Sequence, residues 1–207
     1  MANIIGLTGQ TGAGKSSVRE IFRQKGAAVI DADSVAHDIT ENNTECIYDI
    51  VSHFSCMVLN EKGAINRKKL GKIVFSDKKE LAVLNKIVFP YILDEIEHRT
   101  AEEIAKGSEN VVIDGATIIE SGCGKFCDVL VSVTADENVR TRRIIRRDGI
   151  SREEAEKRVS AQKPEEFYIE NSDIVIENME SLESLSGRVN TVLKNLELLK
   201  EKALAED

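Results

Sequence analysis

The chain has 207 residues, of which 42% are hydrophobic and 31% are charged, as is usual for a globular protein of one or two domains. Its formal net charge of −8 disfavours nucleic acid as a partner, because contact with phosphate backbones requires a basic surface. No apolar run approaches the ~20 residues that span a bilayer, and we expect no signal peptide. These features predict a cytoplasmic protein without a membrane partner. We expect either a monomer or a weak homo-oligomer, although nothing in the composition indicates which.

The cysteines do not have the spacing of a metal site. Cys123 and Cys127 form a C-x3-C pair, but no second pair accompanies them, and the three histidines are scattered. Structural zinc sites usually combine two closely spaced ligand pairs. We therefore expect free thiols in a reducing compartment.

Apolar runs alternate with amphipathic stretches, which predicts a parallel sheet covered by helices on both faces. Five strands are expected, at residues 3–7, 27–30, 111–113, 129–133 and 174–176. A helix is expected from about Lys15 to Gln24, with Val18, Ile21 and Phe22 in the core and Gly26 after its end. Further helices are expected from about residue 136, from a capping box at Ser151, and over 181–204, with an apolar stripe that includes Leu199.

Residues 34–99 have a largely helical pattern and are expected to form a subdomain. One apolar stripe contains Tyr48, Ile50, Val51 and Phe54, and another contains Leu81, Leu84, Ile87 and Val88. A hairpin is expected near residues 59–65. Pro90 is expected to break or kink the second helix after Phe89.

The sequence Gly9-Gln10-Thr11-Gly12-Ala13-Gly14-Lys15-Ser16 fits the phosphate-binding loop G-x-x-x-x-G-K-[ST], between a predicted strand and a predicted helix. Glycines let successive N–H groups turn toward phosphate oxygens, and the helix adds its positive dipole end. Lys15 should reach the β- and γ-phosphates, and the Ser16 hydroxyl should hold Mg²⁺. The alternative is a glycine-rich turn with a chance lysine. The flanking strand and helix favour a nucleoside triphosphate site.

Phosphoryl transfer also needs a carboxylate near the acceptor hydroxyl. Asp33 follows the second predicted strand and is our candidate base; its alternative role is a helix N-cap. Asp31 either takes that capping role instead or contacts Mg²⁺ through water. Asp114 ends the third strand and is either a magnesium-supporting carboxylate or a turn residue beside Gly115. Glu120 either helps to bind substrate or metal or is simply solvated.

Five arginines gather in the helix expected after residue 136, namely Arg140, Arg142, Arg143, Arg146 and Arg147. Arg143 and Arg147 are four residues apart and share a helix face. One interpretation is a solvated basic face, and the other is a lid whose guanidinium groups clamp ATP phosphates. Arg67, in the helical subdomain, is a candidate for a second anionic group on the acceptor.

These motifs, in this order, resemble those of the dephospho-coenzyme A kinase family over almost the whole chain, from about Ile4 to Val192. The matching segments are residues 6–9 with 12–17, 29–33, Arg67 with 74–75, 84–87, 120–122, 143–149, 161–162 and 172–178. The phosphate loop alone indicates a superfamily, and Asp31-Ala32-Asp33 with Arg-x3-Arg-Asp-Gly makes the match more specific. Two positions depart from the family pattern: Phe89-Pro90 replaces a His-Pro pair, and Ala116-Thr117-Ile118 replaces Pro-Leu-Leu.

The resemblance implies transfer of the ATP γ-phosphate to the ribose 3′-hydroxyl of dephospho-coenzyme A, with Mg²⁺ as cofactor. It implies an α/β, three-layer P-loop NTPase fold with a five-stranded parallel sheet, a helical substrate-binding insert (34–107), a nucleotide core (1–33 and 108–207) and an arginine-bearing lid (about 140–165). Asp33, Lys15 and Arg143 would be catalytic. The expected ATP-binding residues are Gly9, Thr11, Gly12, Ala13, Gly14, Lys15, Ser16, Ser17, Arg143 and Arg147. The expected acceptor-binding residues are Thr8, Asp33, Arg67 and Glu120, and the expected magnesium-supporting residues are Ser16 and Asp114.

Three other functions compete with this interpretation. A related kinase would act on another nucleotide or nucleoside. A GTP-dependent switch would need Asn-Lys-x-Asp, and the candidate Asn85-Lys86 is followed by Ile87-Val88 without the aspartate. A nucleotide-binding module without catalysis is disfavoured by the presence of Lys15, Ser16 and Asp33.

Overall fold

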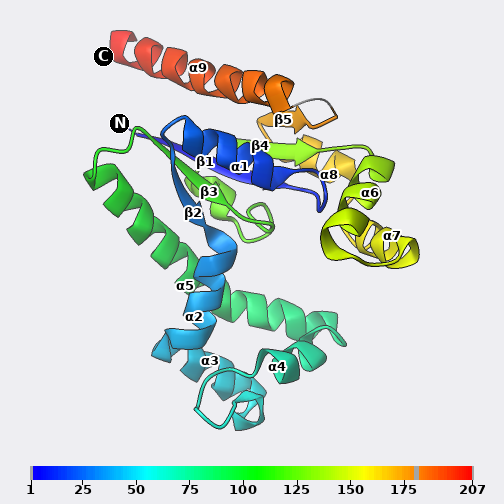
Figure 1. Ribbon diagram of the computed structural model, residues 1–207. Coiled ribbons are helices and arrows are strands. Elements are labelled where there is room, and N and C mark those ends of the chain that lie inside the picture. The colour runs from blue at the N-terminus through cyan, green and yellow to red at the C-terminus, as the bar shows by residue number, and fades with distance from the viewer. Residues whose placement is uncertain (1, 180–181, 207) are drawn as a thin grey trace. The chain divides into compact units, whose positions relative to one another are not determined.

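The computed structural model describes residues 2–179 and 182–206, and its strands form one sheet. The strands are β1 (Asn3–Gly9), β2 (Ala28–Asp31), β3 (Asn110–Asp114), β4 (Val129–Thr134) and β5 (Ile174–Glu177), in the order β2-β3-β1-β4-β5. β1 runs parallel to β3 and β4, and β4 runs parallel to β5 (Figure 1). The predicted five-stranded α/β fold is therefore confirmed, with each strand within two residues of its expected bounds.

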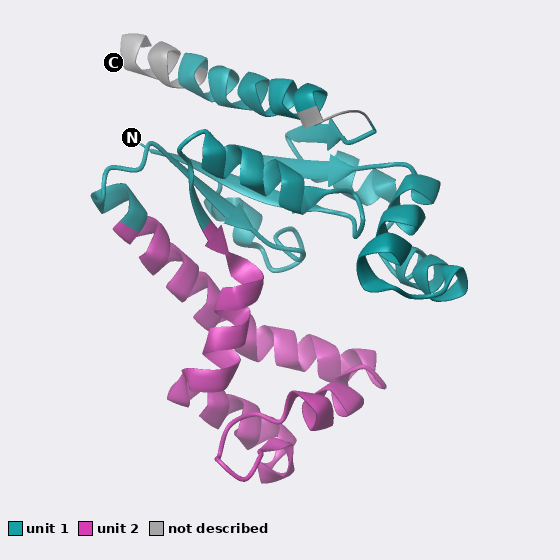
Figure 2. Ribbon diagram, viewed as in Figure 1, with its two compact units in different colours: residues 1–29, 103–207 teal, residues 30–102 magenta. Residues whose placement is uncertain are grey.

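Contacts divide the chain into two compact units (Figure 2). The first, residues 1–29 and 103–207, contains the sheet except for the last two residues of β2, together with α1 (Lys15–Gln24), η2 (Cys123–Phe126), α6 (Glu137–Asp148), α7 (Arg152–Ser160), α8 (Glu165–Glu170) and α9 (Leu182–Glu206). The second, residues 30–102, contains α2 (Ala32–Asn42), α3 (Thr44–Phe54), η1 (Cys56–Val58), α4 (Arg67–Val74) and most of α5 (Lys78–Ala105). The sequence predicts that residues 34–107 bind the acceptor and that residues 1–33 and 108–207 bind the nucleotide. This division by function stays a prediction.

The core of the first unit lies between the sheet and the pair α1 and α9. Ile5 and Leu7 of β1 are fully buried, as are Phe22 of α1 and Val189 of α9. Residues of a strand alternate between the two faces of the sheet, so β1 also presents Gly6 to the opposite face. A Cβ atom on Gly6 would lie 2.6 Å from Leu130 Cδ1 of β4, so side chains pack closely against Gly6 on that face of the sheet.

Helix α1 has the bounds and the buried residues that the sequence predicts. Val18, Ile21 and Phe22 are all buried. Gly26 follows the helix with a φ of 87°, a conformation that favours glycine. The capping box of α7 is also present, because the Ser151 and Glu154 side chains each bond the other's backbone N–H.

Helix α9 buries Leu185, Val189, Val192 and Leu196 against the core, as its stripe predicts. The sequence predicts that this helix begins at Ser181 and includes Leu199 in its apolar stripe. Ser181 and the Leu199 side chain lie outside the described residues. Within the described residues, no helix is both long enough and apolar enough to cross a membrane.

One apolar stripe predicted for the helical unit differs from the face that α3 buries. Tyr48 of α3 is 71% exposed, whereas Cys46, Ile50 and Phe54 are buried. The buried residues are four apart, while Tyr48 is about 200° around the helix from Ile50. The prediction for Tyr48 is therefore wrong, because the apolar face is set by the spacing of four.

Pro90 does not break α5, which continues from Lys78 to Ala105. A proline lacks an N–H group and usually kinks a helix interior, and Figure 1 shows α5 changing direction along its length. Burial of Val88, Ile92 and Ile96 on both sides of the proline supports the uninterrupted helix. The expected hairpin is present in minimal form, as an antiparallel bridge between Leu59 and Ile65.

The start of α2 resolves which aspartate is the N-cap. The Asp31 carboxylate accepts a hydrogen bond of 2.9 Å from Ser34 N, and Asp33 lies in the first turn. We expect Asp31→Ala to lower the free energy of unfolding by about 1 kcal/mol, whereas Asp31→Asn retains most of the stability because asparagine caps equally well. Chemical denaturation of both variants tests this, and equal losses would contradict the capping role.

The four thiols are free and differ in their surroundings. Burial raises the pKa of Cys46 and Cys123 to about 11, and burial together with neighbouring groups raises that of Cys127 to about 12. Cys56 is exposed. Because the thiolate is the reactive form, we expect one thiol per chain to react rapidly with a disulfide reagent near pH 8 and three to react only on unfolding. A Cys56→Ser variant should lose the rapid phase, and its persistence would contradict the assignment.

Candidate active site

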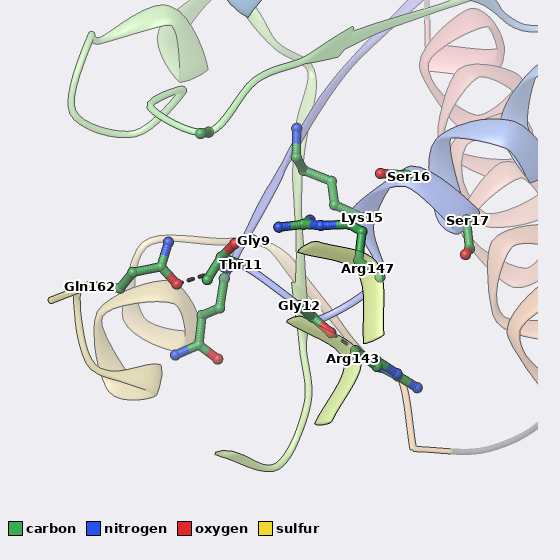
Figure 3. A pocket seen from close by; sticks show the side chains of 12 residues that line it. Gly9, Thr11, Gly12, Lys15, Ser16, Ser17, Arg143, Arg147 and Gln162 are labelled. Carbon is green, nitrogen blue, oxygen red and sulfur yellow. Dashed lines mark hydrogen bonds between the residues drawn. The ribbon is translucent and has the colours of Figure 1, made fainter. Parts of the chain in front are cut away.

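The phosphate-binding loop lines a pocket of about 370 Å³ in the first unit. The loop runs from the end of β1 into α1, and Gly14 is the N-cap of that helix with a φ of 96°. Lys15, Arg143, Arg147 and Gln162 also line the pocket, and Figure 3 shows these side chains around the loop. The N-terminus of α1 adds a positive dipole end. The pocket therefore has the character of an anion site.

The loop requires glycine for its conformation and for space. Gly12 has a φ of 78°, and a Cβ atom there would lie 2.7 Å from Arg140 O. A Cβ atom on Gly14 would lie 2.1 Å from Asn178 Nδ2, which donates a hydrogen bond of 2.7 Å to Ala13 O. Asn178 follows β5 and is buried. The loop is thus packed tightly on the segments that follow β4 and β5.

Lys15 and Arg19 of α1 share one buried carboxylate. Lys15 Nζ lies 2.5 Å from Asp114 Oδ1, and Arg19 Nη1 lies 3.0 Å from Asp114 Oδ2. Asp114 is 2% exposed, at the end of β3. The sheet order brings these groups together because β3 is the neighbour of β1. The sequence drew attention to Lys15 and Asp114 separately, and it gave no signal for Arg19.

Arg140 and Gln162 hold the loop at Thr11. Gln162 Oε1 accepts a hydrogen bond of 2.7 Å from Thr11 N, and Arg140 Nε donates one of 3.1 Å to Thr11 O. Arg140 Nη2 also lies 3.3 Å from Gln162 Oε1. Arg140 is 5% exposed, and burial lowers its pKa. Arg140 was one of the five arginines considered for the lid, but its role at Thr11 was not expected; Gln162 was noted only in a segment that carries the family resemblance.

The two arginines expected to bind ATP have different partners. Arg143 Nη1 donates to Ala13 O at 3.1 Å, and its Nη2 donates to Asn178 O at 3.1 Å. Arg147 pairs with Asp148 through hydrogen bonds of 2.7 Å and 2.9 Å, which raise the pKa of Arg147 and lower that of Asp148. Both arginines line the pocket, so the arginine face of α6 is directed at the loop through these two residues.

The oxygen groups at the pocket suit a magnesium ion delivered with a nucleotide. Ser16 lines the pocket and is exposed, and Lys15, which also lines it, contacts the Asp114 carboxylate. In the described part of the chain, no three His, Cys, Asp or Glu residues gather into a metal cage. Mg²⁺ is commonly held by one or two protein oxygens together with phosphate oxygens and water. The residues therefore fit Mg²⁺ that arrives bound to phosphate.

The remaining candidates belong to several elements. Thr8 is fully buried in β1, where its hydroxyl donates to Ala116 O at 3.4 Å, and Glu120 is exposed. In the helical unit, Asp33 is exposed on α2, and Arg67 at the start of α4 contacts His37 Nδ1.

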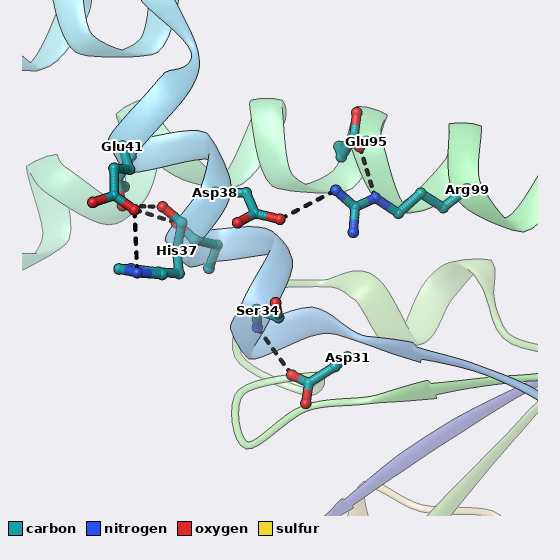
Figure 4. A network of polar contacts seen from close by, with 9 residues as sticks. Asp31, Ser34, His37, Asp38, Glu41, Glu95 and Arg99 are labelled. Atoms are coloured by element: carbon teal, nitrogen blue, oxygen red, sulfur yellow. Dashed lines mark hydrogen bonds and ion pairs between the residues drawn. The ribbon is translucent and has the colours of Figure 1, made fainter. Parts of the chain in front are cut away.

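Figure 4 shows the polar groups along α2. The Asp31 cap lies at its start, and one face carries His37 with Glu41. Asp38 pairs with Arg99 of α5, which also binds Glu95 at 2.7 Å. Surface ion pairs of this kind contribute little to stability, so Asp38 is a suitable matched control for Asp33 on the same helix.

Comparison with known proteins identifies the family. The model of the dephospho-CoA kinase family matches residues 3–184. A dephospho-CoA kinase of Fusobacterium nucleatum is 39% identical over 189 residues, covering 90% of this chain and 94% of the relative, and one of Carboxydothermus hydrogenoformans is 37% identical over 191 residues, covering 92% and 93%. The solved structure of dephospho-CoA kinase from Campylobacter jejuni is 26% identical, covers 95% of this chain and 98% of its own, and superposes with a TM-score of 0.68.

A glycine loop at the end of a strand of a parallel sheet, a lysine directly after its last glycine and arginines directed at the loop are features of a P-loop kinase. The family match extends over nearly the whole chain. The chain therefore belongs to the dephospho-CoA kinase family, a family of kinases that act in the final step of coenzyme A biosynthesis.

Proposed function

We propose that this chain transfers the γ-phosphate of ATP to the 3′-hydroxyl of dephospho-CoA. The observation that carries the proposal is the pocket of the first unit, where the glycine loop, the start of α1 and Lys15 meet. A triphosphate carries several negative charges, and this combination compensates them without a basic protein surface. The family match supports dephospho-CoA as the acceptor.

In the proposed reaction the acceptor oxygen forms a bond to the γ-phosphorus while the bond from that phosphorus to the bridging oxygen of ADP breaks. The proton of the 3′-hydroxyl passes to the Asp33 carboxylate, which acts as general base. Lys15 binds the β- and γ-phosphate oxygens, and Arg143 and Arg147 compensate the charge of the transferring group. Arg143 would first release the carbonyl oxygens of Ala13 and Asn178.

Mg²⁺ would be held by the Ser16 hydroxyl, with the Asp114 carboxylate in support. When bound, Mg²⁺ neutralises charge on the β- and γ-phosphates. The chain's own contribution is the Ser16 hydroxyl at the first turn of α1 and a fixed carboxylate at the end of β3.

The free thiols are typical of a reducing compartment and support a cytoplasmic location.

The proposed acceptor contacts are Arg67, Glu120 and Thr8. Arg67 supplies a guanidinium suited to an acceptor phosphate, and the exposed Glu120 carboxylate suits a hydroxyl or amine. Thr8 contributes through its hydrogen bond to Ala116, which fixes the loop that begins after β3.

A coupled assay of ADP release tests the proposal. We expect ADP release in the presence of Mg²⁺ and ATP to rise at least a hundredfold when dephospho-CoA is added, and the product to carry one additional phosphate by mass spectrometry. Nucleoside monophosphates and nucleosides form the comparison arm. Faster phosphorylation of one of these acceptors would overturn the assignment of dephospho-CoA in favour of a related kinase.

A further inference from the structure

Arg19 occupies a place in the site that the phosphate-binding motif does not explain. It lies on α1 four residues after Lys15, so the two side chains project from the same face of the helix. They bind different oxygens of Asp114: Lys15 binds Oδ1 at 2.5 Å and Arg19 binds Oδ2 at 3.0 Å. A single buried carboxylate is thus held between two cations.

The Lys15–Asp114 pair competes with the nucleotide for the same ammonium group. The proposed role of Lys15 requires Nζ at the phosphate oxygens, whereas here it lies on the carboxylate. Moving Nζ away withdraws one cation from a carboxylate that is 2% exposed. A buried charge that loses its partner is strongly destabilising. Release of Lys15 is therefore costly unless a second cation stays on Asp114.

Arg19 can stay, because its contact is with the other oxygen. Its bond to Oδ2 does not need to change when Oδ1 is released. The Arg19 side chain is also more exposed than that of Lys15, 30% against 19%, so it lies nearer the rim of the site.

We infer that Arg19 is a positioning residue: it remains on Asp114 and compensates the carboxylate while Lys15 moves to the phosphates of ATP. The inference rests on the proposed phosphate role of Lys15. It predicts that Arg19 acts on nucleotide affinity through Asp114, without touching the nucleotide.

Three variants separate this role from a merely structural one. Arg19→Met keeps the apolar stem and removes the charge, and Arg19→Lys restores a charge. Arg23→Met removes the next arginine of α1, which pairs with Glu20 on the exposed surface. The dissociation constant for ATP is measured by calorimetric titration with Mg²⁺ and without acceptor, and kcat and KM are measured with acceptor.

We expect Arg19→Met to raise the dissociation constant and the KM for ATP about tenfold, equivalent to about 1.4 kcal/mol, with a change in kcat of less than threefold. Arg19→Lys should recover most of the affinity, and Arg23→Met should match the wild type. Wild-type affinity in Arg19→Met, or equal losses in Arg19→Met and Arg19→Lys, would overturn the inference.

A double variant tests the route through Asp114. In an Asp114→Asn background the carboxylate charge is gone, so adding Arg19→Met should change the ATP dissociation constant less than twofold; a full tenfold change there would show that Arg19 acts elsewhere. Should Arg19→Met not fold, judged by circular dichroism, Arg19→Gln replaces it with the same expectations. Because the titration contains no acceptor, failure of the wild type to phosphorylate dephospho-CoA would count against the proposed function and leave this comparison readable.

Discussion

The Asp33→Asn variant is expected to turn over about 10²–10⁴ times more slowly than the wild type, the range that a general base contributes. Asparagine keeps the size and polarity of the side chain but cannot take the proton of the acceptor hydroxyl. Affinity for ATP should stay nearly unchanged, because the nucleotide pocket is lined by other residues. Single-turnover measurement of phosphate transfer, together with an ATP titration, provides both values.

Asp38→Asn is the matched control, since Asp38 is on the same helix and its described partner is Arg99. It should retain wild-type kcat and lose at most about 1 kcal/mol of stability, as expected for an exposed ion pair. A wild-type turnover number in Asp33→Asn would remove Asp33 from the mechanism. Equal losses in the two variants would indicate a general effect on α2 rather than proton transfer.

The Lys15→Met variant is expected to lower kcat by about 10²–10³-fold, as removal of a charge-stabilising donor does in other enzymes. Methionine has a similar length but supplies no charge for the β- and γ-phosphates. Arg19 still contacts Asp114 in this variant, so the carboxylate keeps a cation and the fold should be retained. Steady-state kinetics and circular dichroism check these two expectations.

The control for that variant is Lys25→Met, an exposed lysine at the C-cap of the same helix. It should leave kcat and the KM for ATP within twofold of the wild type. A similar loss of activity in both variants would mean that the basic character of α1, rather than Lys15 itself, supports the reaction.

Local patterns predicted much of the fold because they reflect local physical constraints. The glycines of the loop are needed where the backbone has a positive φ or another segment approaches closely, as at Gly12 and Gly14. The bounds of α1 follow from the apolar spacing of Val18, Ile21 and Phe22 and from the glycine after its end. An error occurred where a local pattern had two geometric solutions, because Tyr48 was placed in a stripe whose buried face follows a spacing of four. Of the two outcomes expected at Pro90, the structure excludes a break and agrees with a change of direction along α5.

The candidate site was predictable only in part. Lys15, Ser16 and the loop glycines follow from one contiguous motif, and the sequence identified the carboxylate at the end of the third strand as a candidate. The partners of those groups come from distant parts of the chain. Asp114 is 95 residues from Arg19, and Gln162 is 151 residues from Thr11. No local pattern records which strand will lie beside which.

By itself the sequence therefore determined the order of strands and helices along the chain, the phosphate-binding loop and the family. Each of these depends on residues close together or on motifs in a fixed order. Only the tertiary structure decided that one carboxylate is shared by Lys15 and Arg19 and that Thr11 is held by Arg140 and Gln162. The reason is the sheet order β2-β3-β1-β4-β5. It places the ends of β3 and β4 on either side of the loop that follows β1. Asp114 at the end of β3 therefore contacts Lys15 and Arg19, and Arg140 after β4 contacts Thr11.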